Sequence, residues 1–248
     1  MSTIYAPKLE SLYDSVFANG NLYSVYFLGS KKVILNADAS RVWQYNAFLS
    51  QSNRYLYVTP SLFNEYIQDS KWYSMSTKIK AYGAEAKNYS FIIDNETTQN
   101  VSCSDGVLRS SISSPTKPND LFRGWFTDTN LTEELLLPYY SEDANPKIYA
   151  KWEHAYNLTT VIAGEPDINV GLHSLSAASI SALPDIDIIK CMPEGIYLDH
   201  ELTMPFTELS DEVNTLYIKG TPVELYELDY TGEVAPLLLN AGVYRMKC

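Results

Sequence analysis

The sequence predicts a mainly β protein with minor α-helix, built from three small modules. Apolar residues alternate with polar ones in several short segments, which is the pattern of half-buried strands. Aromatic residues gather around positions 122–126 and 148–152, which suits strands that share a small core. The numbers of basic and acidic residues also change in steps: 8 and 5 over residues 1–82, 6 and 11 over 83–153, and 4 and 14 over 154–248.

The N-terminal module contains a faint internal repeat. A shift of 31 residues aligns three apolar pairs, namely Phe17 with Phe48, Val25 with Leu56, and Phe27 with Val58. Such an alignment predicts short strands in two consecutive rungs of a solenoid. Because solenoids need about three repeats to share a core, we expect this module to rely on a helical cap or on another chain.

The cap is expected after the second of these strands. Thr59 and Pro60 are suited to the N-cap and first turn of a helix. Its buried face would carry two i,i+4 pairs, Leu62 with Tyr66 and Phe63 with Ile67. The segment RYLYVTPSLFNEYIQDSKWYSMSTKI resembles the closing unit of BspA-like leucine-rich-repeat proteins, at Tyr57, Val58, Pro60, Leu62, Tyr66, Trp72 and Ile79. This resemblance covers about residues 11–82 and implies a short leucine-rich-repeat-like unit with a helical cap.

The middle module is predicted to begin with a strand in which Tyr89, Phe91 and Ile93 alternate with their neighbours, ahead of a turn at Asp94 and Asn95. Its further core anchors are Phe122, Trp125, Phe126, Ile148, Tyr149 and Trp152. Together with PTKP, the FRGWFT and IYAKW clusters resemble the internalin B-type (Listeria-Bacteroides) repeat over about residues 87–152. The segment Asn119–Leu121 departs from the family's usual Gly-Tyr. The resemblance implies a β-grasp-like fold that serves as a spacer or interaction module.

Residues 154–248 resemble no family that we can name. Alternating apolar residues around a turn at Thr231 and Gly232 predict a β-meander, and an all-β sandwich or small barrel is the expected outcome. Within this module, a short helix is expected from Leu172 to Leu183, ended by Pro184.

Composition argues against several functions. The net charge of -12 disfavours nucleic-acid binding, and no segment reaches the roughly 18 apolar residues of a membrane span. The three cysteines are widely spaced and the three histidines stand in no metal-binding context, so we predict no disulfide framework, metal or cofactor. Asp128, Asn130 and Thr132 imitate the start of an EF-hand loop, but the required glycine and bidentate glutamate are missing.

No catalytic residues are predicted either, because the sequence has neither a nucleophile elbow nor a phosphate-binding loop. Two carboxylate pairs, Asp185 with Asp187 and Asp199 with Glu201, would face the same way along a strand and would suit acid/base chemistry or a cation. A solvated strand edge or turn is the favoured interpretation of both pairs.

Tyrosine is unusually frequent, with 20 in the chain. If Leu22, Val25 and Phe27 face the core, the outward face of the sheet carries five candidate partner-binding residues: Tyr23, Tyr26, Arg54, Tyr55 and Tyr57. Tyr26 and Tyr57 then become neighbours, either as an ordinary cross-strand pair, which is the favoured alternative, or as part of a binding face.

These features predict a non-enzymatic structural and interaction protein. Both resemblances belong to proteins that act outside cells, yet MSTIYAPKLESLYDSVF lacks the pattern of a signal peptide. We therefore expect a bacteriophage virion component, a fibre, decoration, baseplate or tail protein, made in the host cytoplasm. Its partners would be further copies or other virion proteins, with a host-surface glycan or protein as an additional contact. The alternatives are a fragment of a bacterial cell-surface adhesin and, less favoured, a carbohydrate-active enzyme.

Overall fold

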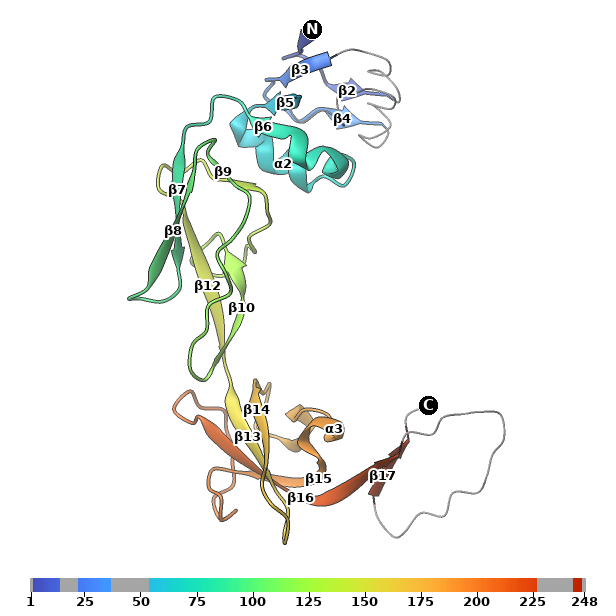
Figure 1. The fold of residues 1–248 in the computed structure, drawn as a ribbon, viewed down its shortest axis with the longest axis vertical. Coiled ribbons are helices and arrows are strands. Elements are labelled where there is room, and N and C mark those ends of the chain that lie inside the picture. Colours follow the sequence, from blue (N-terminus) through green and yellow to red (C-terminus); the bar gives the residue numbers. More distant parts are fainter. Residues whose placement is uncertain (1, 14–21, 37–53, 227–242, 247–248) are drawn as a thin grey trace, which may run out of the picture. The chain divides into compact units, whose positions relative to one another are not determined.

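The computed structural model describes residues 2–13, 22–36, 54–226 and 243–246. Strands make up 42% and helices 11%, which confirms the prediction of a mainly β protein (Figure 1). The chain divides into two compact units, residues 1–114 with 124–151 and residues 115–123 with 152–248. The finer division into three modules, with boundaries after residues 82 and 153, stays a prediction.

A sheet of four parallel strands forms the N-terminal part of the first unit (Figure 1). In spatial order these strands are β1 (Ser2–Tyr5), β3 (Leu22–Phe27), β5 (Tyr55–Val58) and β6 (Ile79–Ala81). Two shorter strands, β2 (Ser11–Leu12) and β4 (Ile34–Leu35), also pair in parallel. Parallel pairing throughout is the arrangement expected of stacked rungs.

The register of this sheet confirms the predicted 31-residue shift. Val25 pairs with Leu56 and Phe27 with Val58, and all four side chains are buried. The third predicted pair, at positions 17 and 48, lies outside the described residues. The expectation of two rungs was wrong, because β1 and β6 extend the sheet on both sides. Equivalent positions on the four strands are 21, 31 and 23 residues apart, so no constant sequence period marks the outer two.

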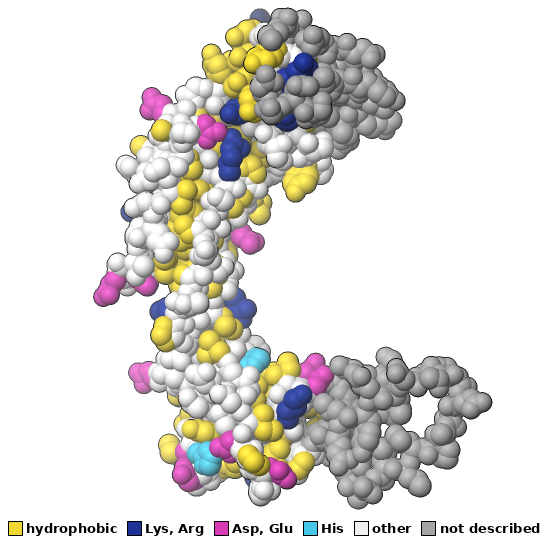
Figure 2. All heavy atoms as spheres, in the orientation of Figure 1, with side chains coloured by type: hydrophobic (Ala, Val, Ile, Leu, Met, Phe, Trp, Pro, Cys, Tyr) yellow, Lys and Arg dark blue, Asp and Glu magenta, His cyan; other side chains and the backbone are white. Residues whose placement is uncertain are grey.

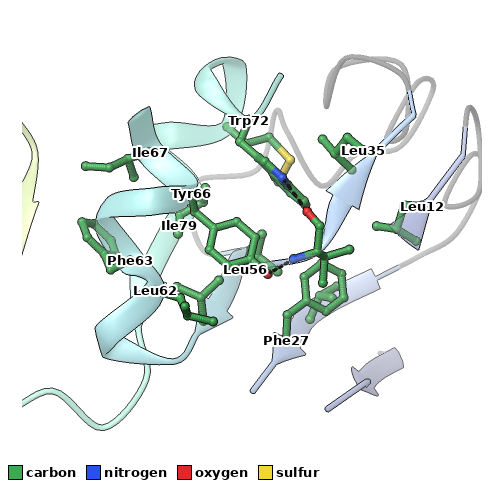
Figure 3. Close-up of a cluster of buried hydrophobic side chains, with 14 of the residues drawn as sticks. Leu12, Phe27, Leu35, Leu56, Leu62, Phe63, Tyr66, Ile67, Trp72 and Ile79 are labelled. Carbon is green, nitrogen blue, oxygen red and sulfur yellow. Dashed lines mark hydrogen bonds between the residues drawn. The ribbon is translucent and has the colours of Figure 1, made fainter. Parts of the chain in front are cut away.

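A helical cap follows β5 and closes the core of the sheet. It consists of the 3-10 turn η1 (Pro60–Leu62), helix α2 (Phe63–Gln68) and the 3-10 helix η2 (Tyr73–Lys78). All four predicted cap residues are buried, as is Trp72. The Tyr66 and Trp72 rings lie edge to face, 5.1 Å apart, within the cluster of Figure 3. The Tyr66 hydroxyl accepts the Val33 N–H at 2.8 Å and the Trp72 indole donates to the Val33 carbonyl at 3.1 Å, so both buried polar groups are paired.

Thr59 occupies the predicted N-cap position, but its side chain does not cap the helix. Its hydroxyl donates to the Gly29 carbonyl at 2.8 Å instead. Gly29 itself has no room for a β-carbon, which would lie 2.7 Å from the Pro7 carbonyl oxygen. Thr59 therefore ties the start of the cap to a tightly packed turn after β3.

A second sheet, here called the first β module (residues 87–154), has the strand order β10, β12, β7, β8 (Figure 1). The hairpin of β7 (Lys87–Ile92) and β8 (Thr98–Cys103) is antiparallel, whereas β12 (Lys147–His154) runs parallel to β7. Strand β10 (Asp120–Phe126) forms the other edge. A separate antiparallel pair joins β9 (Val107–Leu108) to β11 (Tyr139–Tyr140).

The strand and the turn predicted for the beginning of this module are confirmed. Tyr89, Phe91 and Ile93 are buried in alternation along β7 and just beyond it. The turn then closes on Asp94, whose Oδ1 accepts the N–H groups of Glu96 at 2.9 Å and Thr97 at 2.7 Å. A carboxylate that binds its own following backbone is a common turn device, which explains why the sequence predicted the turn correctly.

The predicted aromatic anchors divide into two groups. Trp125, Phe126 and Ile148 are buried, and the Trp125 ring packs edge-on against Phe91 at 4.9 Å. Phe122, Tyr149 and Trp152 are only half-buried, so the assignment of Trp152 to the core is corrected. Trp152 instead packs against Phe122 at 5.6 Å, with the Lys117 ammonium 5.8 Å from its ring. The clustering of aromatic residues in the sequence did not distinguish this surface pair from the core.

The second β module (residues 156–226) contains β13 (Tyr156–Val161), β14 (Ile168–His173), β15 (Cys191–Tyr197) and β16 (Thr215–Tyr226). Their order is β14, β13, β16, β15, with β17 (Val243–Met246) parallel to β16 (Figure 1). The 3-10 turn η3 (Ile180–Ala182) and the short helix α3 (Ile186–Ile189) precede β15. Five core residues have no exposed surface: Leu158, Ile189, Cys191, Leu216 and Ile218.

Three expectations for this region were wrong. The described strands form a single sheet rather than a sandwich or barrel. The helix expected from Leu172 to Leu183 is replaced by the end of β14 and the turn η3, because Leu172 pairs with Asn157 in the sheet. The expected meander requires antiparallel neighbours, but β16 and β17 are parallel. Its predicted turn at positions 231 and 232 lies outside the described residues.

Among the described helices, none has the length and apolarity needed to cross a membrane.

Candidate functional site

The outward face of the N-terminal sheet carries a ladder of stacked tyrosines. Tyr5, Tyr26 and Tyr57 occupy paired positions on β1, β3 and β5. The rings of Tyr5 and Tyr26 are 4.3 Å apart and within 10° of parallel, and those of Tyr26 and Tyr57 are 4.7 Å apart and within 11°. Because parallel strands repeat in register, identical side chains at one level stack into a continuous aromatic column.

Three more side chains widen this column into a surface. The Tyr82 ring meets Tyr26 and Tyr57 edge-on at 5.4 and 6.1 Å. Tyr55 packs against Tyr57 at 6.3 Å, and the Lys80 ammonium lies 4.2 Å from the centre of the Tyr55 ring. We call Tyr5, Tyr26, Tyr55, Tyr57, Tyr82 and Lys80 the tyrosine face. Figure 2 shows hydrophobic side chains, with basic ones beside them, on the surface of this part of the molecule.

The core side of the same strands explains why the tyrosines point outward. Val25, Leu56 and Ile79 form a ladder on the opposite face, and none has any exposed surface. Side chains alternate along a strand, so Tyr26 and Tyr57 must face away from this core. The burial of Val25 and Leu56 therefore determines where the tyrosines lie.

Two members of the face remain well exposed, since Tyr5 retains 63% and Tyr82 46% of its accessible surface. Partial desolvation within the stack raises the pKa of Tyr5 and of Tyr57, and the adjacent Tyr26 raises both further. The hydroxyls of Tyr5 and Tyr57 therefore stay neutral at physiological pH and keep both a donor and acceptors. The face combines flat apolar area with uncharged hydrogen-bonding groups, which is the chemistry of protein and sugar recognition surfaces.

The five predicted partner-binding residues are only partly brought together. Tyr26, Tyr55 and Tyr57 lie on the tyrosine face, as their strand positions required. Tyr23 lies at an irregularity in the pairing of β1 with β3. Its two neighbours, Leu22 and Ser24, pair with the consecutive residues Ser2 and Thr3, so Tyr23 itself has no partner on β1. Tyr23 and Arg54 are half-buried, and Tyr23 lies near enough to Tyr57 to contribute to its raised pKa.

Sequence reasoning missed Tyr5 and Tyr82. Tyr5 lies on β1, whose four residues gave no strand prediction, and Tyr82 immediately follows β6. The available signal was the recurrence of tyrosine itself, because Tyr5 precedes Tyr26 by a plausible repeat length. Tyr82 carried no such signal, since it reaches Tyr26 and Tyr57 only through the three-dimensional position of the chain after β6.

The carboxylate pairs considered for catalysis are engaged in local structure. Asp199 accepts three hydrogen bonds from its own loop, from the Thr203 N–H at 3.1 Å, the Thr203 hydroxyl at 2.8 Å and the Met204 N–H at 2.6 Å. These bonds hold the pKa of Asp199 below its ordinary value despite an opposing desolvation contribution. Asp185 is the N-cap residue of α3. Within the described part of the chain, no three His, Cys, Asp or Glu side chains are grouped to hold a metal ion.

No protein-family model matches the chain, and no curated protein matches it at a significant level. The likenesses to BspA-like and internalin B-type repeats therefore rest on the motif residues quoted above.

Proposed function

We propose that this protein is a non-enzymatic interaction protein that docks on a partner through the tyrosine face. The observation that carries the proposal is the stack of Tyr5, Tyr26 and Tyr57 on the outside of a parallel sheet. An ordinary cross-strand contact needs one pair, whereas this column continues over three strands, from the exposed ring of Tyr5 to the half-buried ring of Tyr57. Rigid aromatic side chains lose little conformational entropy on binding, which suits them to interfaces.

The setting we propose is a bacteriophage virion, in which the partner is another copy or a neighbouring virion protein and the face also contacts a host surface. The modular β architecture supports this proposal, as does the exposed edge strand β1, whose outer side has no partner strand among the described residues. A bacterial cell-surface adhesin would use the same docking chemistry. Mass spectrometry of purified particles distinguishes the two settings.

The experiment replaces Tyr26 and Tyr57 together by serine in the full chain. We expect the fold to persist, because the buried ladder beneath is unchanged, and self-association or particle incorporation to fall at least tenfold through loss of the stacked area. Tyr73→Ser is the matched control, since Tyr73 is 71% exposed on η2 and takes no part in the stack. Light scattering and circular dichroism report assembly and folding.

A double variant that associates and incorporates like the parent would exclude docking through this face. A parent chain that is strictly monomeric and present in no particle would exclude the virion proposal.

A further inference from the structure

A cavity of about 330 Å³ opens beside the tyrosine face in the first unit. It is lined by Tyr55, Ser76, Thr77, Lys80, Arg109 and Pro138. Tyr55 and Lys80 belong to both surfaces, so the cavity and the tyrosine face are continuous. Its volume lies near the lower end of the roughly 300–1,000 Å³ typical of small-ligand sites.

The lining combines three kinds of group. Tyr55 offers an aromatic ring, Ser76 and Thr77 offer hydroxyls, and Lys80 and Arg109 offer positive charge. Arg109 is held by Asp105, with Nη2 and Oδ2 2.7 Å apart. The Lys80 ammonium lies over the Tyr55 ring, and none of the described carboxylates is within ion-pair distance of it. The cavity therefore keeps a net positive charge next to an aromatic wall.

We propose that this cavity binds a carboxylate-bearing sugar residue of a surface glycan. A sugar ring stacks its C–H face on an aromatic ring, its hydroxyls bond to Ser76 and Thr77, and its carboxylate is held by Lys80 and Arg109. This inference rests on the proposed docking function and names the chemistry of one partner.

The strongly acidic chain selects the kind of anion that binds. A net charge of -12 repels long polyanions. At about 0.1 M salt, charges more than about 10 Å away are largely screened, so a single acidic residue meets mainly Lys80, Arg109 and the Asp105 carboxylate that pairs with Arg109. These three groups together carry one net positive charge. The site therefore suits an isolated acidic sugar rather than a nucleic acid or a densely charged polysaccharide.

The test uses the full chain, a glucuronic acid-containing trisaccharide and its glucose counterpart of identical linkage, with binding measured by isothermal titration calorimetry. We expect the acidic probe to bind about tenfold or more tightly than the neutral one, as a charge-assisted contact predicts. Lys80→Ala and Arg109→Gln should each remove most of this preference, and should weaken binding of the neutral probe much less than binding of the acidic one. Lys31→Ala, at an exposed residue outside the cavity lining, is the control.

Equal binding of the two probes, or a preference that survives both substitutions, would overturn the acidic-sugar assignment and leave docking through the tyrosine face intact. Absence of all saccharide binding would also overturn it. The docking proposal fails separately, if the double tyrosine variant assembles normally. Circular dichroism of each variant confirms that a loss of binding is not a loss of folding.

A different set of observations concerns the two β modules. Taken from the β10 or β15 edge, both sheets have the same strand order, β10-β12-β7-β8 and β15-β16-β13-β14. In each, the first two strands in sequence form an antiparallel hairpin, and the last strand pairs in parallel with the first. Phe91 pairs with Ile148 in one and Leu158 with Leu216 in the other, all four with no exposed surface.

The polar contacts repeat as well. Two residues before these core pairs, the hydroxyls of Tyr89 and Tyr156 accept the N–H groups of Ser141 at 3.2 Å and Ser210 at 3.1 Å. The Ser141 hydroxyl then accepts the Asp143 N–H at 3.2 Å, and the Ser210 hydroxyl accepts the Glu212 N–H at 3.2 Å. The bond at Tyr89 is buried and the bond at Tyr156 is partly buried. Because each hydroxyl accepts the amide of one serine at the same place in its sheet, the recurrence is informative.

A loop of the same construction follows β10 and β15. Asp128 Oδ1 accepts the N–H groups of Thr132 at 2.9 Å and Glu133 at 2.8 Å. Asp199 binds the corresponding groups of Thr203 and Met204, 71 residues later. Leu131 and Leu202, also 71 residues apart, both have left-handed backbones, with φ of 56° and 58°. Non-glycine residues rarely adopt this conformation.

We infer that the two β modules are tandem copies of one structural unit, in which the segment after β12 begins the second copy. The test is hydrogen exchange on the full chain with Tyr89→Phe and Tyr156→Phe. The first substitution should speed exchange at residues 139–143 and the second at 208–212, at corresponding places. Tyr149→Phe and Tyr217→Phe, which pair next to the core positions, are controls.

If Tyr156→Phe leaves residues 208–212 unchanged while Tyr89→Phe affects 139–143, the correspondence is wrong. An experimental structure in which residues 157–161 do not pair in parallel with 215–219 would contradict it directly.

Discussion

A comparison of the first and second β modules separates the contacts that both sheets share from those that only one of them has. Both keep a buried tyrosine on the first strand, an aspartate that organises the loop after the edge strand, and paired apolar residues at the centre. They differ at the positions around this frame. These side chains and the backbone groups that they contact are thus common to both modules, whereas the surrounding side chains differ.

One difference lies between the last strand of each module and the neighbouring edge strand, that is, between β12 and β10 and between β16 and β15. In the first module Trp152 packs on Phe122, whereas in the second Gly220 pairs with Pro193. A β-carbon on Gly220 would come within 2.5 Å of the Met192 carbonyl oxygen and 2.6 Å of the Cys191 sulfur. At this place the two strands are thus in contact through aromatic side chains in the first module, whereas in the second module their backbones approach closely.

A second difference lies beside the serine that recurs in both modules, Ser141 in the first and Ser210 in the second. Tyr140 packs against the N-terminal core, and its backbone N–H and carbonyl both bond to the Asn64 side chain, at 2.8 and 2.7 Å. The residue before Ser210 is Leu209, which retains 46% of its accessible surface. The first module uses this position to attach the N-terminal sheet, and the second leaves it open.

The largest expected effect separates core from surface anchors in the first module. Trp125→Ala should cost about 3–5 kcal/mol of unfolding free energy, because it empties a buried ring site. Trp152→Ala should cost clearly less, about 1–2 kcal/mol, since that ring is half-exposed. Equilibrium denaturation of the full chain measures both. Equal losses would return Trp152 to the core.

Gly220→Ala tests the close approach of the β15 and β16 backbones in the second module. The new methyl group must displace the Met192 backbone, so we expect a loss of about 1–3 kcal/mol. The matched change is Gly164→Ala, where no atom lies within 4 Å of the added carbon but φ is +82°. Urea denaturation that ranks Gly164→Ala as the more costly would show that strain, rather than crowding, dominates.

Tyr140→Ser and Leu209→Ser compare the attached and the open position. We expect the first to destabilise the first unit by about 1 kcal/mol and the second to change stability by less than about 0.5 kcal/mol. Hydrogen exchange at α2 should rise only for Tyr140→Ser, because only that residue packs against the N-terminal core. A similar response to both substitutions would remove the contrast between the modules.

The smallest effect concerns pH. Backbone hydrogen bonds within its loop hold the pKa of Asp128 below its ordinary value, and the pKa of Asp199 is likewise lowered. A lowered folded-state pKa adds stability that is fully present above the unfolded value of about 3.9 and is lost as pH falls through the folded value. Asp128→Asn and Asp199→Asn should each reduce the fall in denaturation midpoint below about pH 4. NMR titration of either carboxyl at or above its ordinary value would contradict this prediction.

The sequence alone was sufficient where a pattern is local or strictly periodic. The alternation at Tyr89, Phe91 and Ile93, the turn on Asp94 and the Val25–Leu56 register all depend on strand geometry and turn chemistry that neighbouring residues determine. The Tyr26–Tyr57 pair followed from the same register.

Tertiary structure decided the long-range pairings that no constant sequence repeat marks. The unpredicted strands are β1 and β6, at the two edges of the N-terminal sheet. The contacts of Tyr5 and Tyr82 and the Asn64–Tyr140 hydrogen bonds likewise join residues with no periodic relation in the sequence. The likeness of the two β modules was hidden because hydrogen bonds to backbone groups specify position without specifying most side chains. Only a few residues, such as Tyr89 and Tyr156 or Asp128 and Asp199, are identical at equivalent positions of the two modules. Their equivalence can be recognised only after the strands of the two sheets have been matched.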